Sequence, residues 1–264
     1  MLRWLLIGLC WLPPVQAAQL LVIIDDIGNN HALGQRTLQL PGPLNLAFLP
    51  HTPHARSLAS EAYQHGHGIL LHAPMANEQG AKLGPGGLYP DMDAATLQQT
   101  LRDNLAAIPH VQGVNNHMGS LLTQDPDAMA AIMPVIASTG LYFVDSLTSP
   151  HSVALQQAIL AGIPALERDV FLDNDLSPTA LQRQFAKAVA RARQRGYAVL
   201  IGHPYPETLT FLQQALPALT GQQVHLQRID QFLQQRLWQK FYPLPSPPSR
   251  YLLQASPGYR GASE

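Results

Sequence analysis

Short apolar runs recur along this sequence, and longer segments with helical spacing of apolar residues separate them. A run of about four to six apolar residues between polar or turn-forming residues is typical of a strand buried on both faces. Strands that alternate with helices pair in parallel, because each helix returns the chain to the same end of the sheet. We expect strands at residues 20–24, 44–49, 68–71, 111–115, 141–144, 163–166, 198–201 and 224–226.

The segments between the runs carry clear helix signals. Residues 91–108 begin with an Asp cap and repeat apolar residues three and four positions apart. Ser177 and Pro178 open another helical segment, which ends at Gly196. About seven or eight such units predict an α/β fold, an irregular (β/α) barrel of about seven parallel strands. An open doubly wound sheet is the alternative.

The two ends of the chain differ from the part between them. One Arg precedes an apolar run, two prolines interrupt the run, and small residues follow up to Ala18. This order predicts a secretory signal peptide over residues 1–18, because the run is shorter than the roughly 20 residues that span a bilayer. Residues 242–264 are rich in Pro, Ser and Gly, as is typical of a disordered tail. We expect the folded domain at residues 19–241, in a protein exported to the periplasm or cell envelope with no stable membrane span after signal cleavage.

Charge and cysteine content argue against several functions. The 264 residues have a formal net charge of −1, and 12% of them are charged. The chain therefore lacks the basic footprint of nucleic-acid-binding proteins, and we expect no nucleic-acid partner. The one cysteine, Cys10, lies in the predicted signal peptide. The mature protein is expected to contain no disulfide, thiol nucleophile or thiolate metal ligand.

Ionisable or metal-binding side chains follow six of the expected strands. Because the carboxyl ends of parallel barrel strands meet on one face, these side chains are expected to converge there. Their shared position is stronger evidence for a functional site than any one residue. The residues are Asp25 and Asp26, His72, His117, Asp145, Arg168 and Asp169, and His203.

The residue types at these strand ends favour a metal-dependent hydrolase. Carboxylates and histidines without cysteine suit Zn²⁺ or another divalent cation, held by three protein ligands with one open position. A cation also explains why Asp25 and Asp26 are adjacent, because it neutralises one carboxylate while the other can take a proton from water. Side chains alternate along a strand, so the chain must bend at Asp26 to turn both inward. Gly28 and Asn29 favour that bend.

Six short motifs occur in the order IIDDIG, LLHAPM, NNHMGS, FVDSLTS, RDVFLD and IGHP. As an ordered set they resemble the divergent polysaccharide deacetylase family, which is related to the NodB-homology carbohydrate deacetylases. The resemblance covers residues 19–241 and implies an irregular NodB-like barrel. It also implies a metal-dependent hydrolase that removes N- or O-acetyl groups from a polysaccharide. The predicted export suggests a peptidoglycan-like substrate.

The resemblance also assigns roles to individual residues. It implies that Asp25 is the general base, that Asp26 is a metal ligand and that His72 is a second ligand. Related enzymes place another His four residues after the first, where this chain has Ala76. We expect His117 to replace that ligand.

Further positions complete the expected site. His203 resembles the His that protonates the leaving group, at the end of the last main strand. Arg168 and Asp169 resemble a pair that orients a catalytic residue through hydrogen bonds. Asp145 is expected to do likewise or to bind substrate.

Several of these residues also have purely structural interpretations. Asp145 can cap the following helix, and Arg168 can form a buried ion pair with Asp169. We expect Asp173 and Asp175 to be loop or cap residues.

Three functions compete on this sequence. The leading hypothesis is an exported metal-dependent carbohydrate deacetylase that hydrolyses acetyl groups from an envelope glycan. The second is a catalytically degenerate barrel that binds an envelope glycan or a protein, which Ala76 keeps open. The third is a two-carboxylate glycosidase, which would leave the three histidines unexplained.

Overall fold

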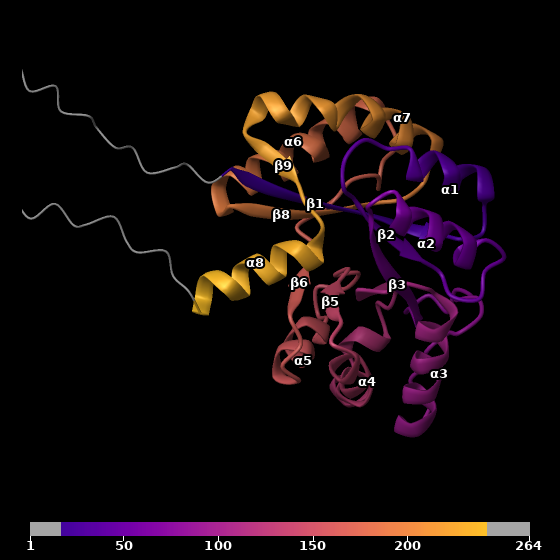
Figure 1. The fold of residues 1–264 in the computed structure, drawn as a ribbon. Helices are drawn as coiled ribbons and strands as arrows, with labels where there is room; N and C mark the ends of the chain where they lie inside the picture. The colour runs from indigo at the N-terminus through magenta and orange to yellow at the C-terminus, as the bar shows by residue number, and fades with distance from the viewer. Residues whose placement is uncertain (1–16, 242–264) are drawn as a thin grey trace, which may run out of the picture.

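The computed structural model describes residues 17–241, in which strands and helices alternate along most of the chain (Figure 1). The strands are β1 (Ala18–Ile27), β2 (Asn45–Phe48), β3 (Gly68–Met75), β4 (Gly113–Met118), β5 (Tyr142–Asp145), β6 (Ala165–Glu167), β7 (Val170–Phe171), β8 (Tyr197–Gly202) and β9 (Val224–Leu226). The α-helices are α1 (His31–Leu38), α2 (Ala55–Gln64), α3 (Ala94–Ala107), α4 (Pro126–Thr139), α5 (Ala154–Leu160), α6 (Pro178–Arg195), α7 (Pro206–Ala215) and α8 (Ile229–Phe241).

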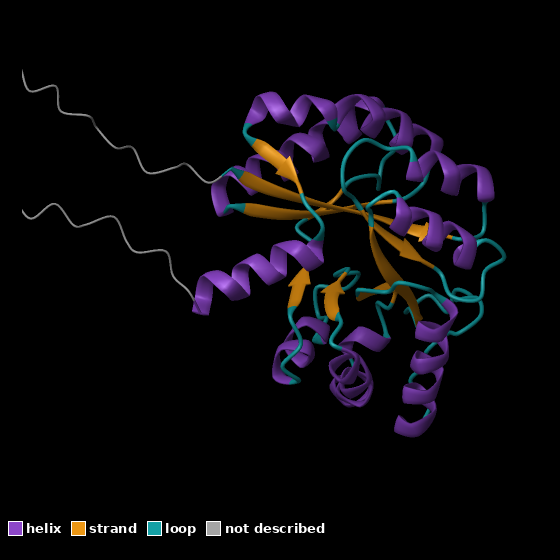
Figure 2. Ribbon diagram, in the orientation of Figure 1, coloured by secondary structure: helices purple, strands orange, loops and turns teal. Residues whose placement is uncertain are grey.

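The strands form one parallel sheet that curls into a half-barrel. Its order is β6-β5-β4-β3-β2-β1-β8-β7, and β9 also pairs with β1. β6 and β7 stand at opposite ends of this order, so the barrel has a seam between them. Figure 2 shows the strands in the middle of the molecule, with helices around the outside. The predicted irregular (β/α) barrel is confirmed.

Apolar side chains on the two faces of the sheet enter two different cores. In β1, Val22 and Ile24 belong to the cluster that the outer helices cover. Leu21 and Ile23, on the opposite face of the same strand, belong to the cluster inside the barrel, as the two-residue period of a strand requires. Phe232 of α8 joins this inner cluster, so α8 packs across the amino-terminal end of the barrel.

The strand and helix predictions compare well with the observed elements. Each of the eight expected strands has a counterpart, and the two-residue strand β7 was not expected. Asp93 and Ser177 cap α3 and α6 through their side chains, and Gly196 ends α6 in a left-handed conformation. Residues 1–16 of the predicted signal peptide and the whole predicted tail, 242–264, lie outside the described residues. Within the described part, no helix combines the length and the apolar character needed to cross a bilayer.

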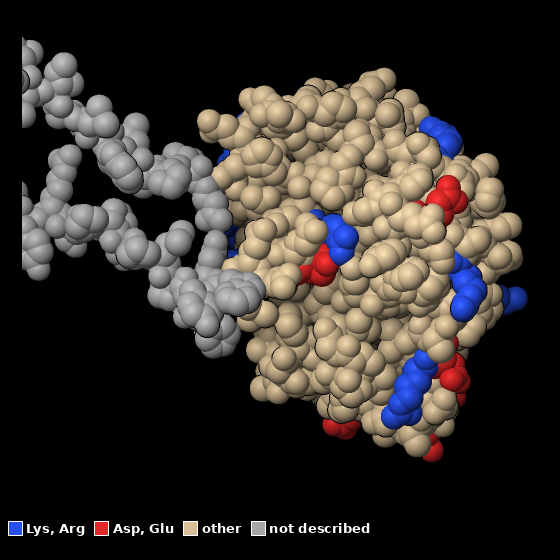
Figure 3. Space-filling model, in the orientation of Figure 1, with Lys and Arg blue, Asp and Glu red and all other residues tan. Residues whose placement is uncertain are grey.

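Charged side chains are sparse on the face of the molecule drawn in Figure 3. Basic and acidic groups lie near one another there, without an extended region of one sign. This distribution agrees with the low charged fraction of the sequence.

Candidate active site

Asp26, His72 and His117 meet at the carboxyl ends of β1, β3 and β4. Asp26 Oδ1 lies 2.8 Å from His117 Nδ1 and 3.2 Å from His72 Nε2, and the two nitrogens are 3.2 Å apart. The three atoms form a nearly regular triangle. Ligand atoms about 2.0–2.1 Å from a tetrahedral Zn²⁺ lie about 3.3 Å from one another, so this spacing suits such an ion.

Strand register explains how the two histidines meet. β3 pairs with β4 so that His72 lies beside Asn115 and Pro74 lies beside His117. Side chains two residues apart on a strand point to the same face. His117 pairs with Pro74, two residues after His72, so both imidazoles lie on the same face, with His117 two residues further toward the carboxyl ends of the strands.

Asp26 reaches the same point because the backbone of β1 is irregular there. Strand alternation would place Asp25 inside the barrel, after Leu21 and Ile23, and would turn Asp26 outward. Asp26 instead adopts a left-handed conformation with φ 57°, and the pairing register with β2 shifts between Ile24 and Ile27. Both neighbouring carboxylates therefore face the interior, and the predicted bend at Asp26 is confirmed.

The donor atoms of this triangle fit a divalent cation. Asp26 Oδ1 is buried and has no hydrogen bond of acceptable geometry, despite the two imidazole nitrogens beside it. A buried oxygen without a partner is costly unless another group satisfies it. One carboxylate oxygen and two imidazole nitrogens are donors that Zn²⁺ accepts.

Charge at this point is distributed in favour of cation binding. Burial disfavours the charged form of Asp26, but the His117 and His72 imidazoles outweigh burial and hold the pKa of this carboxyl well below its usual range. Burial also opposes charge on His72, yet Asp25 and Asp26 raise the pKa of its imidazole. Two carboxylates therefore attract positive charge to the site, either as protons on histidine or as a metal ion.

Asp25 lies next to His72, outside the triangle. It is 2% exposed, its Oδ1 accepts a hydrogen bond from Asn115 Nδ2 at 2.8 Å, and the same oxygen is 3.7 Å from His72 Nδ1. Burial raises the pKa of this carboxyl, although the neighbouring His72 and His203 oppose the rise. A carboxylate with a raised pKa accepts a proton more readily than one in water, which suits a general base.

His203 lies near Asp26, directly after the end of β8. Its Nε2 lies 4.0 Å from Asp26 Oδ2, and its Nδ1 lies 3.0 Å from Asp173 Oδ1. Asp173 Oδ2 also accepts hydrogen bonds from the His203 backbone N–H and the Thr208 hydroxyl. Burial lowers the pKa of His203, but the bond to Asp173 and the charge of Asp25 outweigh it and raise the pKa to about 9.

Sequence comparison decides the family of this chain. The sequence model of the family described as "Divergent polysaccharide deacetylase" matches residues 22–233. The chain belongs to the divergent polysaccharide deacetylase family. It is 35% identical over 201 residues to the uncharacterized protein YibQ of Escherichia coli (strain K12), a match that covers 76% of this chain and 63% of YibQ. It is 36% identical over 199 residues to an uncharacterized protein of Haemophilus influenzae, covering 75% of this chain and 71% of that protein.

Solved structures share the fold of this family member. The uncharacterized protein ATU2773 from Agrobacterium tumefaciens C58 matches with a TM-score of 0.79 and 21% identity, over 83% of this chain and 90% of that chain. A protein described as "T48 deacetylase with substrate" matches at 0.51 and 14% identity, covering 83% and 92%. A Bacillus anthracis protein described as a CE4 family pseudoenzyme matches at 0.50 and 12% identity, covering 82% and 66%.

Five of the sequence-predicted site residues come together in this family member. Asp25, Asp26, His72, His117 and His203 form one continuous group, as the distances above show. At position 76, where the family resemblance implies a second His, this chain has a small buried residue, Ala76, which is 6% exposed. His117, from the neighbouring strand, supplies the third side chain of the triangle instead.

The prediction for Asp169 requires a correction. Its carboxylate contacts Arg195 and Arg191 of α6 and accepts a hydrogen bond from the Val199 backbone N–H. β7 begins at the next residue, so Asp169 stands on the amino-terminal side of this strand and away from the site. The carboxylate that orients a site residue is Asp173, which follows β7 and was expected to be only a loop or cap residue.

Asp145 and Arg168 organise the loop after β5. The Asp145 carboxylate accepts hydrogen bonds from the Leu147 N–H and the Ser152 hydroxyl, both in this loop. The alternative prediction, a helix cap, is wrong, because Val153 is the N-cap residue of α5. Arg168 donates to the carbonyl oxygens of Ser146 and Leu147, at 2.7 Å each. Arg168 also lies over the Phe171 ring, 5.2 Å from its centroid. The alternative interpretation, an ion pair with Asp169, is wrong, because Asp169 pairs with Arg191 and Arg195.

Asn115 and Asp173 are the site residues that sequence reasoning missed. Asn115 lies two residues before His117 on β4 and beside His72 on β3. Because side chains two residues apart on a strand share a face, the sequence could have identified Asn115 as a residue facing the site. Asp173 follows a strand of only two residues, which is too short to leave a recognisable pattern.

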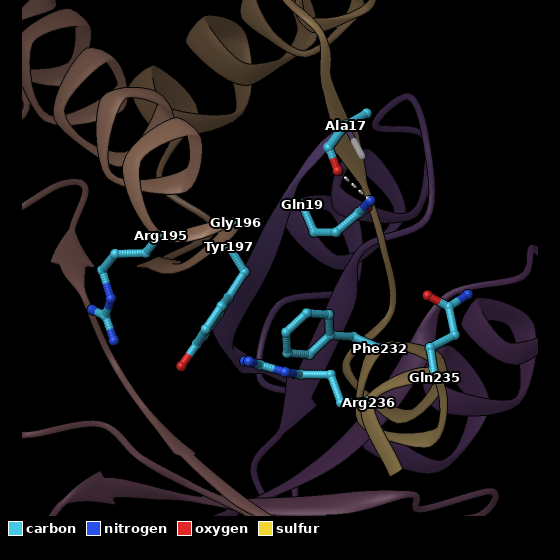
Figure 4. A pocket seen from close by; sticks show the side chains of 8 residues that line it. All are labelled: Ala17, Gln19, Arg195, Gly196, Tyr197, Phe232, Gln235 and Arg236. Atoms are coloured by element: carbon cyan, nitrogen blue, oxygen red, sulfur yellow. Dashed lines mark hydrogen bonds between the residues drawn. The ribbon is translucent and has the colours of Figure 1, made fainter. Parts of the chain in front are cut away.

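A separate cavity lies at the opposite end of the barrel. Its volume is about 200 Å³, and it is lined by residues at the amino-terminal ends of β1 and β8 together with α8. Figure 4 shows Arg195 and Arg236 on either side of the Tyr197 ring, each 5.1–5.4 Å from the ring centroid. Since Asp26 lies at the carboxyl end of β1, this cavity is separate from the candidate active site.

Proposed function

We propose that this protein is an exported, metal-dependent carbohydrate deacetylase that hydrolyses acetyl groups from an envelope glycan. The observation that carries the proposal is the convergence of Asp26, His72 and His117 on one point, with Asp25 3.7 Å from His72 and His203 4.0 Å from Asp26. Membership of the divergent polysaccharide deacetylase family supports a polysaccharide or peptidoglycan-like substrate.

Asp26 Oδ1, His72 Nε2 and His117 Nδ1 would hold the cation, Zn²⁺ or another divalent ion. When bound, the cation supplies Lewis-acid polarisation of the acetyl carbonyl and lowers the pKa of water at its open position. Two neutral imidazoles and one carboxylate leave a net positive charge on the occupied site, which suits the binding of a carbonyl oxygen that gains negative charge during hydrolysis.

Asp25 acts as the general base in this proposal. Its carboxylate takes the proton from the water that attacks the acetyl carbon. The Asn115 amide fixes Asp25 Oδ1 by a 2.8 Å hydrogen bond, so the carboxylate loses little freedom at the moment of reaction. Burial keeps this carboxylate out of bulk water and raises its pKa, which makes it a stronger base.

His203 acts as the general acid. In the metal-free protein at neutral pH it carries a proton on each nitrogen, because its pKa is raised to about 9. Asp173 holds the Nδ1 proton, so Nε2 faces the site and gives its proton to the departing sugar amine or hydroxyl. The imidazole is then neutral and is recharged from solvent.

The proposal of export is based on the sequence of the predicted signal peptide, residues 1–18. The charged start, apolar run and small residues up to Ala18 support cleavage by signal peptidase and location in the periplasm or cell envelope. Expression of the full chain followed by cell fractionation and N-terminal sequencing tests this part. A mature chain that begins after Ala17 or Ala18 in the periplasmic fraction supports it, and an uncleaved cytoplasmic chain contradicts it.

The reaction is tested with purified protein, ZnCl₂ and acetylated glycans, by measuring acetate release and zinc affinity together. Asp25→Asn should retain zinc and lose on the order of 10²- to 10⁴-fold in turnover, because it removes the base and no ligand. His72→Ala should lose both zinc binding and turnover. Asp175→Asn is a matched carboxylate control, since Asp175 only accepts the Ser177 N–H ahead of α6. Full activity in Asp25→Asn would contradict the assignment.

A catalytically degenerate glycan- or protein-binding barrel is the second candidate. Two observations favour it: Ala76 stands where the family resemblance implies a second metal-binding His, and a solved protein with this fold is described as a pseudoenzyme. Stoichiometric zinc and saturable glycan binding without acetate release would support this candidate over the deacetylase.

A further inference from the structure

Asn115 is a fully buried amide between the proposed base and a proposed metal ligand. It lies on β4, directly beside His72 of β3 in the strand register. Its side chain is 0% exposed. It contacts two groups that would perform different chemical tasks, the imidazole of His72 and the carboxylate of Asp25.

Each polar atom of this amide has a partner. Asn115 Nδ2 donates to Asp25 Oδ1 at 2.8 Å and to Ser146 Oγ at 3.3 Å. Asn115 Oδ1 lies 2.9 Å from His72 Nδ1. The reversed amide would place its oxygen against the Asp25 carboxylate, where two acceptors would repel each other. An ionised Asp25 therefore fixes the orientation of the amide.

This orientation also determines the proton position on His72. An amide oxygen can only accept a hydrogen bond, so His72 Nδ1 must carry a proton. The lone pair of the neutral imidazole is then on Nε2, the atom that stands 3.2 Å from both Asp26 Oδ1 and His117 Nδ1. A metal-binding imidazole needs its lone pair at this nitrogen and its other N–H hydrogen-bonded.

The adjacent Asn116 shows that burial alone does not create this arrangement. Asn116 is 1% exposed, but alternation turns it to the other face of β4. Its amide donates to the Met118 carbonyl and accepts the Ser146 backbone N–H. It supports the loops around the site, whereas Asn115 contacts the site residues themselves.

We propose that Asn115 is a positioning residue that joins the two halves of the site: it sets the metal-binding tautomer of His72 and holds the Asp25 carboxylate in place. The inference rests on the proposed function above and adds a residue to it. One side chain thereby makes metal binding and base catalysis depend on the same hydrogen-bond network.

Asn115→Leu tests the metal half of this proposal. Leucine has nearly the shape of asparagine but cannot accept the His72 N–H, so zinc affinity should fall about 10- to 100-fold. ZnCl₂ titration of the metal-stripped full chain by calorimetry measures this, with thermal unfolding recorded beside it. Asn104→Leu is the matched control, because Asn104 is 0% exposed and its amide bonds go to His51 and the Gly86 carbonyl. The control should lose stability and keep its zinc affinity.

Asn115→Asp separates the two tasks. A carboxylate oxygen can still accept the His72 N–H, so zinc affinity should stay within about threefold of the wild type or increase. The variant cannot donate to Asp25 and adds a like charge beside it, which raises the pKa of the base. Turnover should fall about 10- to 100-fold, with KM little changed and the acid limb of the pH–rate profile moved to higher pH.

Opposite results would overturn the proposal. Asn115→Leu with wild-type zinc affinity, or with a loss no greater than that of Asn104→Leu, would show that the amide does not set the ligand. If Asn115→Leu does not fold, Asn115→Asp decides alone: weak zinc binding or unchanged turnover in that variant would overturn the inference.

The wild type reports separately on the proposed function. Zinc binding without acetate release would contradict the deacetylase reaction, while the zinc affinities of the Asn115 variants would still test the ligand half of the inference. If the wild type releases acetate and the Asn115 variants behave like the Asn104 control, the deacetylase reaction is supported and the positioning role of Asn115 is contradicted.

Discussion

Asp169 and Asp173 occupy equivalent positions on the two sides of β7, but their surroundings differ. Asp169 accepts the backbone N–H of Val199 in β8 at 2.9 Å, and Asp173 accepts the backbone N–H of His203, directly after β8, at 2.6 Å. Both carboxylates are nearly inaccessible to solvent, with side chains that are 4% and 0% exposed. Four residues separate Asp169 from Asp173, and four residues separate the two N–H donors, Val199 and His203.

The partners determine what each carboxylate can do. Asp169 contacts Arg191 and Arg195, whose guanidinium groups remain charged at any physiological pH and whose side chains are 40% and 44% exposed. Asp173 contacts the imidazole of His203, which gains and loses a proton and faces Asp26. Burial of a carboxylate is therefore not by itself a sign of function. A titratable partner at the carboxyl ends of the strands is the distinguishing feature.

The largest effect is expected when the functional member of the pair is changed. Asp173→Asn removes the charge that holds His203 protonated and oriented, so turnover should fall on the order of 10²- to 10⁴-fold, the range for loss of general acid catalysis. Zinc affinity should remain, because Asp173 does not contact the triangle of Asp26, His72 and His117. Acetate release and zinc titration measure the two quantities. Near-normal turnover in this variant would remove the distinction between the two carboxylates.

The second expected effect is a shift in the titration of His203 in the metal-free protein. Its pKa is raised to about 9 in the fold, against about 6.5 in an unfolded chain. The folded state therefore binds the proton more tightly, and this stabilisation is complete below about pH 6.5 and is lost as the pH rises through about 9. Imidazole NMR should follow this titration and show a lower pKa in Asp173→Asn. An unchanged pKa of His203 in this variant would mean that Asp173 is not the main cause of the raised value.

The smallest effect is expected at the structural member. Asp169→Asn keeps an acceptor for the Val199 N–H but loses its charge beside Arg195 and Arg191, so unfolding free energy should fall by about 1 kcal/mol. Turnover should stay within about twofold of the wild type, because no contact of Asp169 reaches the site. Chemical denaturation and acetate release measure these. A loss of turnover comparable to that of Asp173→Asn would contradict the comparison.

The outline of the fold and most of the site were predictable because they depend on local pattern. Apolar runs of strand length mark nearly every strand, since a strand buried on both faces has few polar residues. Asp25, Asp26, His72, His117 and His203 lie within two residues of the ends of the expected strands, and parallel pairing brings those ends together. β7 escaped prediction because two residues, Val170 and Phe171, form too short a run, and the position of Asp173 was missed with it.

The order of apolar and polar residues thus specified parallel strands, their covering helices and the end of the barrel at which the chemistry is expected. The chain alone did not reveal that Asn115 bridges Asp25 and His72, or that Asp173 rather than Asp169 holds His203. Those pairings depend on strand register and on the left-handed turn at Asp26. Register is set by packing between segments far apart in sequence, and a shift of one residue would turn every side chain to the opposite face.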